Sequence, residues 1–352
     1  MKRIVTLPGD GIGPEITASA LKVLEAASQH VDFKFEVEEH TIGGAAIDQD
    51  GHPFPDATKK ACQAADAILL GAVGGPKWEQ AERTPEAGLL EMRQTLELFA
   101  NLRPVEMHDY LLKDSPLKEE IVKGTDFVMV RELTGGIYFG RPKYFDEEEA
   151  VDTLHYNRGE IERIVRLAFD LAKTRKNKVT LVDKANVLAS SQLWRKVATQ
   201  IAQEEYPEVE FEWMYVDNAA MQIITNPTAY DVIVTENMFG DILSDEASVI
   251  TGSLGMLPSA SLSQTNASLY EPIHGSAPDI AGKDIANPMS MILSVTMMLR
   301  QSFEEFEMAD RIEHACAAVM DRGMRTADLG GDTSHSTFTQ AVIDEINKGA
   351  SS

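Results

Sequence analysis

Residues 232–246 have the sequence Val232-Ile-Val-Thr-Glu-Asn-Met-Phe-Gly-Asp-Ile-Leu-Ser-Asp-Glu246, and this segment says most about the fold of the chain. The apolar run 232–234 predicts a buried strand. A turn at Gly240 then leads into a helix, where Asp241 and Asp245 lie four residues apart and so project from one face. Two hard oxygen donors at this spacing suit a divalent cation that also binds a substrate. A simple acidic helix start is the alternative, because aspartate near a helix N-terminus is favourable by itself.

The chain is strongly acidic and poor in cysteine. Its formal net charge of −24 argues against nucleic acid or an anionic membrane surface as a partner, since both are negatively charged. Cys62 and Cys316 are the only cysteines, which excludes a disulfide scaffold and fits a reducing cytoplasm. The most apolar helical stretch, 289–299, is too short to span a membrane and predicts a core or interface helix. We therefore expect a cytoplasmic protein that acts on a small molecule.

Short apolar runs alternate with helical patterns over most of the 352 residues. Such alternation predicts an α/β protein with much parallel sheet. The length suggests two domains, and the chain is expected to cross between them near 99–104 and within the Gly/Ser-rich stretch 251–259. The expected strands are 3–7, 67–70, 127–130, 179–182 and 232–234, and the expected helices are 14–27, 88–99, 159–173 and 190–204.

A glycine-rich segment, Pro8-Gly-Asp-Gly-Ile-Gly-Pro-Glu15, follows the first expected strand and opens a helix. Its glycine spacing differs from the G-x-G-x-x-G of the Rossmann fingerprint, so that inference is not supported. A glycine turn that feeds a helix is the simpler interpretation. A second turn-rich segment, 271–280, contains His274, which could stack on or bond an adenine, and Asp279, which could accept from ribose hydroxyls.

Six further residues have side chains suited to anion binding or proton transfer. The arginines could clamp carboxylates through paired hydrogen bonds, and two of them are expected at strand ends. The tyrosine lies in a glycine-flanked segment and could donate a proton, while the lysine at the end of a strand could accept one. The aspartate, also at a strand end, could complete a metal site. Each of them also has an ordinary structural explanation. These residues are Arg93, Arg103, Arg131, Tyr138, Lys184 and Asp217.

Taken together, these segments resemble the β-decarboxylating dehydrogenases, the family of isocitrate and 3-isopropylmalate dehydrogenases. The resemblance runs from Leu7 to about Gly331, and 237–246 is its most specific part. It implies an α/β, two-domain fold of the isopropylmalate-dehydrogenase type, with a large mixed sheet flanked by helices and no Rossmann fold. A cofactor-binding domain would comprise 1–99 and 252–352. Residues 100–251 would bind substrate and metal and form the dimer, with the active site in the cleft between the domains.

The resemblance also implies a role for each candidate residue. Tyr138 and Lys184 would be catalytic. Asp241 and Asp245 would bind Mg²⁺ or Mn²⁺ together with Asp217 from the other subunit of a homodimer, whose active sites would be shared. The implied substrate contacts are Glu86, Leu89, Leu90, Arg93, Arg103, Arg131 and Asp217. The implied NAD contacts are Ile12, Gly74, Gly75, Glu271, His274, Gly275, Ser276, Ala277, Pro278, Asp279, Ile280 and Asn287.

The expected substrate follows from the stretch before the first arginine, Glu86-Ala-Gly-Leu-Leu-Glu-Met-Arg93. Relatives that use isocitrate place Ser and Asn there. Leu89 and Leu90 would instead face an isopropyl group, whose burial stabilises by about 0.8 kcal/mol per CH₂, whereas an unpaired carboxylate there would cost several times more. We therefore expect oxidative decarboxylation of (2R,3S)-3-isopropylmalate to 4-methyl-2-oxopentanoate and CO₂ in leucine biosynthesis. NADP-dependent relatives carry Lys and Tyr after the His-Gly-Ser-Ala-Pro turn, where this chain has Asp279 and Ile280. An acid there would accept hydrogen bonds from ribose hydroxyls and repel a 2′-phosphate, which favours NAD.

Three alternatives differ in function. A D-malate or tartrate type of decarboxylating dehydrogenase shares the arginines and the metal, although Glu86 resembles the glutamate that the family places near the nicotinamide and favours isopropylmalate. A non-catalytic regulatory subunit would typically have lost the metal carboxylates, the tyrosine or the lysine, all of which are intact here. A simple anion-binding module would need neither Tyr138 nor Lys184.

Overall fold

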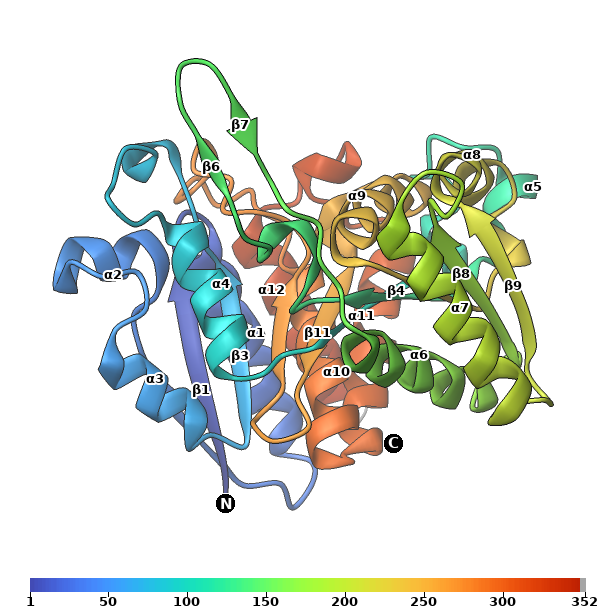
Figure 1. The fold of residues 1–352 in the computed structure, drawn as a ribbon. Coiled ribbons are helices and arrows are strands. Elements are labelled where there is room, and N and C mark those ends of the chain that lie inside the picture. Colours follow the sequence, from blue (N-terminus) through green and yellow to red (C-terminus); the bar gives the residue numbers. More distant parts are fainter. Residues whose placement is uncertain (349–352) are drawn as a thin grey trace. The chain divides into compact units, whose positions relative to one another are not determined.

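A computed structural model describes residues 1–348 of the chain (Figure 1). The chain divides into two compact units. Unit 1 comprises Met1–Leu98 and Ser253–Ser352, and unit 2 comprises Phe99–Gly252. These bounds differ by one residue from the expected ones, and the functions expected of the two units stay predictions.

The sheet of unit 1 has the strand order β2-β1-β3-β12-β11. All neighbouring pairs are parallel except β11 and β12, which are antiparallel. Every residue of the central strand β3 is buried, as expected for a parallel strand covered on both faces. The strands are β1 (Lys2–Gly9), β2 (Phe35–Glu39), β3 (Ala67–Ala72), β11 (Pro258–Leu262) and β12 (Leu269–Pro272).

The helices of unit 1 come from both ends of the chain. The first helix of the chain packs on β1 and β3 and also contacts all three C-terminal helices. This contact brings residues more than 300 positions apart into one core, because Ser19 and His335 share a 2.6 Å hydrogen bond. The helices are α1 (Gly13–Ser28), α2 (Gly43–Asp50), α3 (Asp56–Gln63), α4 (Pro85–Thr95), α10 (Met289–Phe303), α11 (Phe306–Asp321) and α12 (His335–Lys348).

The sheet of unit 2 has the strand order β4-β5-β10-β8-β9. The pair β4–β5 is antiparallel and the other three pairs are parallel. A separate hairpin, β6 with β7, projects from the rest of this unit (Figure 1). The strands are β4 (Ala100–Glu106), β5 (Asp126–Glu132), β6 (Tyr144–Phe145), β7 (Ala150–Val151), β8 (Lys178–Asp183), β9 (Glu210–Tyr215) and β10 (Val232–Thr235).

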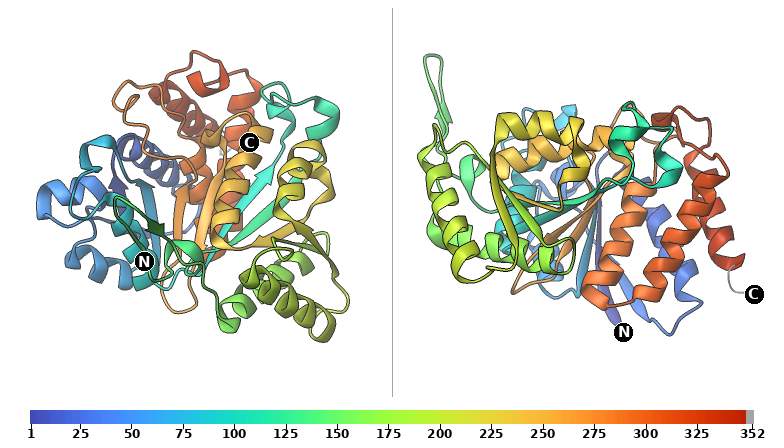
Figure 2. Two further views of the ribbon diagram at one scale, coloured as in Figure 1. Left: turned by 45° about the horizontal axis from the view of Figure 1, so that its top comes forward. Right: turned by 90° about the vertical axis from the view of Figure 1, so that its right-hand side faces the viewer.

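Two helix pairs cover the sheet of unit 2. Helices α6 and α7 pack against each other, and so do α8 and α9 (Figure 2). Helix α6 contacts β5, β8 and β10, whereas α9 contacts β5 and β10. The helices are α5 (Glu119–Val122), α6 (Arg158–Lys173), α7 (Ala189–Glu204), α8 (Val216–Thr225) and α9 (Asn237–Ala247).

The predicted α/β class, with mixed sheet flanked by helices, is confirmed. Neither strand order is the Rossmann order 3-2-1-4-5-6. Within residues 1–348, no helix is both long enough and apolar enough to cross a membrane.

Four local expectations were wrong. Helix α4 begins at Pro85 and ends at Thr95, because Thr84 caps its start and Glu97 has a positive φ of 52° just beyond its end. Arg103 lies in the middle of β4 and not at a strand end. Asp217 lies in the first turn of α8, two residues beyond the end of β9. The expected start of α9 was also too late, as described below.

Candidate active site

Helix α9 starts at Asn237, four residues earlier than expected, because Glu236 caps it. The Glu236 carboxylate accepts hydrogen bonds from the backbone N–H groups of Met238 (3.2 Å) and Phe239 (2.9 Å). An acidic cap satisfies free N–H donors and complements the helix dipole, so residues 237–240 belong to the helix. Gly240 is therefore a helical residue and not a turn. A Cβ at this position would lie 2.6 Å from Cγ of Arg131, so the glycine makes room for that arginine.

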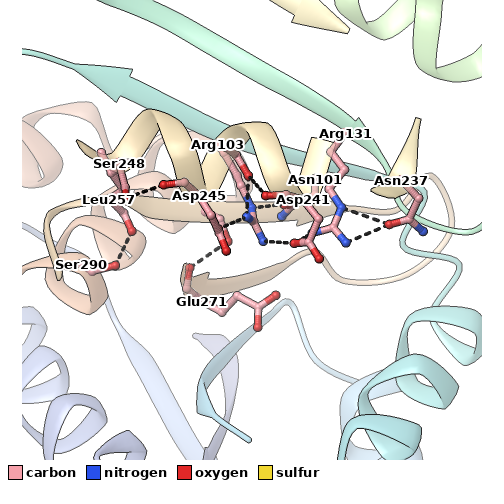
Figure 3. A network of polar contacts seen from close by, with 12 residues as sticks. Asn101, Arg103, Arg131, Asn237, Asp241, Asp245, Ser248, Leu257, Glu271 and Ser290 are labelled. Carbon is pink, nitrogen blue, oxygen red and sulfur yellow. Dashed lines mark hydrogen bonds and ion pairs between the residues drawn. The ribbon is translucent and has the colours of Figure 1, made fainter. Parts of the chain in front are cut away.

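The two aspartates of α9 face two arginines from the neighbouring strands (Figure 3). Arg131 Nη1 lies 2.5 Å from Asp241 Oδ1. Arg103 Nη1 lies 3.0 Å from Asp245 Oδ1, and its Nη2 lies 3.5 Å from Asp241 Oδ1. The arginine side chains are 9% and 2% exposed, whereas those of Asp241 and Asp245 are 35% and 54% exposed. The carboxylates are thus accessible, with buried positive charge behind them.

Neutral side chains fix both guanidinium groups. Arg131 donates from Nε and Nη2 to Asn237 Oδ1, at 3.0 and 2.8 Å. Arg103 donates from Nε to Asn101 Oδ1 at 2.7 Å and from Nη1 to Ser244 Oγ at 2.6 Å. These three partners were missed in the sequence. Asn101 lies two positions before Arg103 on one strand, a spacing that places both side chains on the same face and could have identified it.

Tyr138 lies beside this cluster, at the end of the 3₁₀ turn η3 (Gly136–Tyr138). Its hydroxyl donates to Asp241 Oδ2 at 3.0 Å. Burial and then the charge of Asp241 raise the pKa of Tyr138 to about 12. The phenol is therefore protonated near neutral pH and can act as a proton donor.

A buried network holds the loop that carries Tyr138. Glu132 is fully buried and accepts from the N–H groups of Thr134 (2.9 Å) and Gly135 (2.8 Å). Tyr156 lies against the same loop, where a Cβ on Gly135 or Gly136 would come within 2.7 Å of its ring or hydroxyl. Its hydroxyl oxygen also accepts from the N–H of Asn237 at 3.0 Å. The loop and the start of α9 are thereby fixed to each other.

Lys184 and Asp217 form a separate pair. The lysine directly follows β8, its Nζ donates to the aspartate, and this hydrogen bond lowers the pKa of Asp217. The Asp217 side chain is 62% exposed. Across residues 1–348, no three His, Cys, Asp or Glu side chains gather as a set of metal ligands. Within one protomer, then, Asp217 does not join the two aspartates of α9.

Unit 1 holds the remaining predicted substrate contacts on α4. Glu86, Leu89, Leu90 and Arg93 follow one another at helical spacing and share one face. Arg93 is buried, and its Nη2 lies 3.7 Å from Glu271 Oε1. The two leucines are half-buried and Glu86 is exposed. This face thus combines a cation, an apolar surface and an acid.

Most of the predicted cofactor contacts lie on three loops of unit 1, whereas Glu271 lies on β12 and Asn287 lies just before α10. Ile12 N–H donates to the carbonyl oxygen of Ser276 at 2.8 Å, which joins the glycine-rich segment to the loop 274–280. In that loop Gly275, Pro278 and Asp279 are exposed, Ala277 has a positive φ of 38°, and His274 and Ile280 are half-buried. Gly74 and Gly75 form a turn beside Glu86. Asn287 instead donates to Asp328 at 3.0 Å and accepts from the N–H of Met289 at 2.9 Å, so its side chain already has structural partners.

Comparison with known proteins gives the family. The family model described as isocitrate/isopropylmalate dehydrogenase matches residues 3–346. The chain belongs to this family. A protein from Listeria monocytogenes serotype 4b (strain F2365), named 3-isopropylmalate dehydrogenase, is 61% identical over 347 residues and covers 99% of both chains. The protein of the same name from Bacillus licheniformis (strain ATCC 14580) is 59% identical, over 98% of this chain and 95% of its own.

Solved structures agree with this assignment. The crystal structure of isocitrate dehydrogenase from Methylococcus capsulatus has a TM-score of 0.88 and 37% sequence identity, and the match covers 98% of this chain and 99% of that one. The predicted family and its type of fold are thereby confirmed. The residue roles that the resemblance implies stay predictions.

Proposed function

We propose that the chain catalyses the NAD-dependent oxidative decarboxylation of (2R,3S)-3-isopropylmalate to 4-methyl-2-oxopentanoate and CO₂, a step of leucine biosynthesis. The arrangement on α9 carries this proposal, because fixed arginines, accessible carboxylates and a protonated phenol meet there. The relatives named 3-isopropylmalate dehydrogenase, at 61% and 59% identity over nearly the whole chain, support the same substrate.

The arginines would bind the two carboxylates of the substrate. Arg103 and Arg131 are held by neutral partners and lose little conformational freedom when they bind. A guanidinium group donates two parallel N–H bonds to a carboxylate, which fixes the orientation as well as the position of the ligand. Arg93 on α4 would add a third cation from unit 1.

Asp241 and Asp245 would hold Mg²⁺ or Mn²⁺. Both are oxygen donors, lie one helical turn apart and are more exposed than the arginines behind them, so the donor set fits a hard dication. Burial raises the pKa of Asp245, Arg103 lowers it in part, and Asp241 raises it, so a bound cation would further favour its charged form. When bound, the cation acts as a Lewis acid at the C2 hydroxyl and its neighbouring carboxylate. Asp217 of a second protomer would complete the site.

Two side chains would move protons. Lys184 of a second protomer would accept the proton of the C2 hydroxyl while hydride leaves C2 for NAD. Loss of CO₂ from C3 then leaves an enolate, with the electron pair of the broken bond on the C2 oxygen. Tyr138 would deliver a proton to C3, and its hydroxyl, with a pKa of about 12, carries that proton at neutral pH. The hydrogen bond to Asp241 sets the position of the hydroxyl.

The face of α4 would select the substrate. Leu89 and Leu90 are half-buried and offer an apolar surface to an isopropyl group. Isocitrate would place a carboxylate there, and desolvation of that charge without a partner is costly. D-malate would leave the same surface without a contact.

NAD would be favoured over NADP by charge. Asp279 is exposed and can accept hydrogen bonds from ribose hydroxyls, whereas a 2′-phosphate beside it would be repelled. The loop 274–280 would thus carry the adenosine end of the dinucleotide.

A homodimer would supply the second protomer. Several large apolar side chains of unit 2 are exposed, including Phe145 at 85% and Ile242 at 60%. Exposed apolar groups of this kind favour association. The buried, unpaired Cys62 and Cys316 are compatible with the reducing cytoplasm, where we place the enzyme.

A substrate panel tests the proposal. Purified protein with Mg²⁺ or Mn²⁺ is assayed for reduction of NAD and of NADP with 3-isopropylmalate, isocitrate, D-malate and tartrate. We expect kcat/KM for 3-isopropylmalate with NAD to exceed every other combination by about 100-fold or more, about 2.7 kcal/mol of discrimination. A higher kcat/KM with D-malate or tartrate would refute the substrate assignment, and no reduction with any acid would refute an enzymatic role.

A further inference from the structure

Asp10 is a buried carboxylate in the loop between β1 and α1. It is only 4% exposed, yet no side-chain cation within residues 1–348 forms an ion pair with it; three backbone N–H groups donate to it instead. Gly44 and Gly74 donate to Oδ2 and Ala45 donates to Oδ1, each at 2.8 Å. A buried carboxylate loses its hydrogen bonds to water. The three N–H donors replace them with hydrogen bonds that are strong because the acceptor is charged. One side chain therefore fixes two segments that are about 30 residues apart in sequence.

One of these segments is the turn at Gly74 and Gly75. Both residues have positive φ values, 108° and 154°, so the turn depends on glycine. A Cβ on Gly74 would lie 2.6 Å from Oε1 of Glu86, which places the turn directly against that acid. The bond to Asp10 orients the Gly74 peptide and so sets the surface beside Glu86.

The loop that holds Asp10 also contacts the segment 274–280, through Gly11 and Ile12. Ile12 N–H donates to the Ser276 carbonyl oxygen at 2.8 Å. A Cβ on Gly11 would lie 2.0 Å from that same oxygen, so the backbones approach as closely as glycine permits. Residues 10–12 therefore connect the turn beside Glu86 with the loop that we propose for the adenosine end of NAD.

We infer that Asp10 is a positioning residue for the dinucleotide. It holds the turn at Gly74 in a fixed position relative to the loop 274–280. This inference rests on the proposed NAD-dependent function. Asp10 acts through Gly44, Ala45 and Gly74 and is not itself a cofactor contact. The carboxylate matters because both of its oxygens accept hydrogen bonds. An asparagine has one oxygen and an N–H₂ group, and that group would face an N–H donor.

The variant Asp10→Asn tests this inference, with Asp231→Asn as the matched control. Asp231 is 1% exposed and accepts from the N–H groups of Lys176 (3.0 Å) and Lys178 (3.2 Å). Unlike Asp10, it also accepts from Nε of Arg175 at 2.8 Å, so its loss should lower Tm at least as much. It precedes β10 in unit 2, at the opposite end of that strand from α9. Both variants remove a buried carboxylate with backbone donors, so both should lower Tm. Only Asp10→Asn should weaken cofactor binding.

The measurements are the Kd of NADH by calorimetry and the KM values and kcat of the reaction, at a temperature where circular dichroism shows all proteins folded. For Asp10→Asn we expect Kd for NADH and KM for NAD to rise about tenfold, while kcat at saturating NAD and KM for 3-isopropylmalate change less than about threefold. For Asp231→Asn all four should stay within about twofold. An unchanged NADH affinity in folded Asp10→Asn, or equal losses in both variants, would overturn the inference.

A second variant keeps the test decisive if Asp10→Asn does not fold. Ala45 lies in the first turn of α2, where proline is tolerated. Ala45→Pro keeps the Asp10 carboxylate but replaces one of its donors with a ring carbon, which displaces Oδ1 from its position. We expect Kd for NADH to rise about threefold, and an unchanged Kd would overturn the inference. Wild-type protein that neither binds NADH nor reduces NAD would refute the proposed function itself. NAD reduction by wild type together with unaltered variants would refute only the role of Asp10.

Discussion

Tyr138 is the residue whose environment is most specific to one chemical task. Its hydroxyl donates to Asp241 at 3.0 Å, and burial together with that carboxylate raises the pKa of Tyr138 to about 12. A phenol with a lower pKa would lose its proton more readily at neutral pH. The phenol thus carries its proton at neutral pH, as the proposed protonation of C3 requires.

Replacement of Tyr138 by phenylalanine should remove this donor and leave the fold intact. We expect kcat to fall by about 100- to 10,000-fold, the usual contribution of a positioned acid, with Tm nearly unchanged. The decline should appear in kcat more than in KM, because the hydroxyl acts on an intermediate. Steady-state kinetics and thermal unfolding measure both effects.

Tyr206→Phe is the matched control for that variant. The hydroxyl of Tyr206 also donates to a carboxylate of unit 2, Asp170, at 2.9 Å, and the pKa of Tyr206 is likewise raised to about 12, mainly by burial. It lies away from α9, so its kcat should stay within about twofold of wild type. Similar kcat values in Tyr138→Phe and Tyr206→Phe would exclude Tyr138 as the acid.

At this scale the sequence identified the charged residues better than their partners. The motif 237–246 and the resemblance it supports pointed to both arginines, both aspartates and Tyr138. The spacing of Asn101 and Arg103 on one strand could have identified Asn101, but Ser244, which also holds Arg103, could not be identified in this way. The role of Ser244 depends on which faces of β4 and α9 meet, and that is decided by packing and not by local pattern.

Helix α9 shows how one element fixes the geometry of the site. Its cap at Glu236 sets the start, and its rotation then places Asp241 and Asp245 toward the arginines. Gly240 lies on the side where Arg131 passes, and the absence of a side chain there permits that passage.

Gly240→Ala should therefore destabilise the protein, although helix propensity alone predicts a gain of about 1 kcal/mol. The new Cβ would lie 2.6 Å from Arg131 Cγ and 2.8 Å from its Cβ, so the arginine or the helix must move. We expect a loss of about 1–3 kcal/mol in the free energy of unfolding, measured by urea denaturation, and a raised KM for the substrate.

Gly159→Ala provides the comparison on another helix. Gly159 lies in the first turn of α6, and the nearest atom to a new Cβ would be Asn157 Oδ1 at 3.3 Å, a looser contact than the 2.6 Å at Gly240. Its free energy of unfolding should change by less than about 0.5 kcal/mol. A stabilised Gly240→Ala variant with normal KM would show that the contact with Arg131 has no such effect.

The elements that the sequence predicted are those with strong periodic or apolar signals. All five expected strands exist, because parallel strands buried on both faces are nearly continuous apolar runs. The strands β2, with sequence FEVEE, and β11, with sequence PSASL, gave no such signal. One is a charged edge strand and the other is built from small residues, so their pairing comes from tertiary context.

At the scale of the whole molecule, we ask whether two chains contribute residues to each active site. Within residues 1–348 of a single chain, Asp217 pairs with Lys184 and does not join Asp241 and Asp245 in a set of metal ligands. We propose that the pair serves the α9 cluster of a second protomer. Each site would then need residues from both chains.

Two inactive variants should therefore restore activity when combined. In a mixed dimer of Asp245→Asn and Lys184→Ala, one site carries both defects and the other carries none. Random mixing should give about a quarter of wild-type activity, because about half of the dimers are mixed and each has one intact site. Co-expression with two affinity tags isolates the mixed dimer. If it is as inactive as the parents, each active site lies within one chain.

Whole-chain organisation was the hardest feature to derive from local pattern. Periodicity could not show that β11, β12 and α10–α12 join the N-terminal strands in unit 1, since no local signal records which distant segments pair. The resemblance to the family supplied that expectation, and the strand order of unit 1 shows the pairing of β3 with β12.

The stoichiometry of the reaction tests the proposed function most directly. Purified protein is incubated with a limiting amount of 3-isopropylmalate, excess NAD and Mg²⁺, and NADH and CO₂ are both quantified at completion. We predict equal amounts of NADH and CO₂, each equal to the substrate supplied, and background rates in excess chelator or with a folded Asp245→Asn variant. NADH formed without CO₂, or full turnover in chelator, would contradict a metal-dependent oxidative decarboxylation.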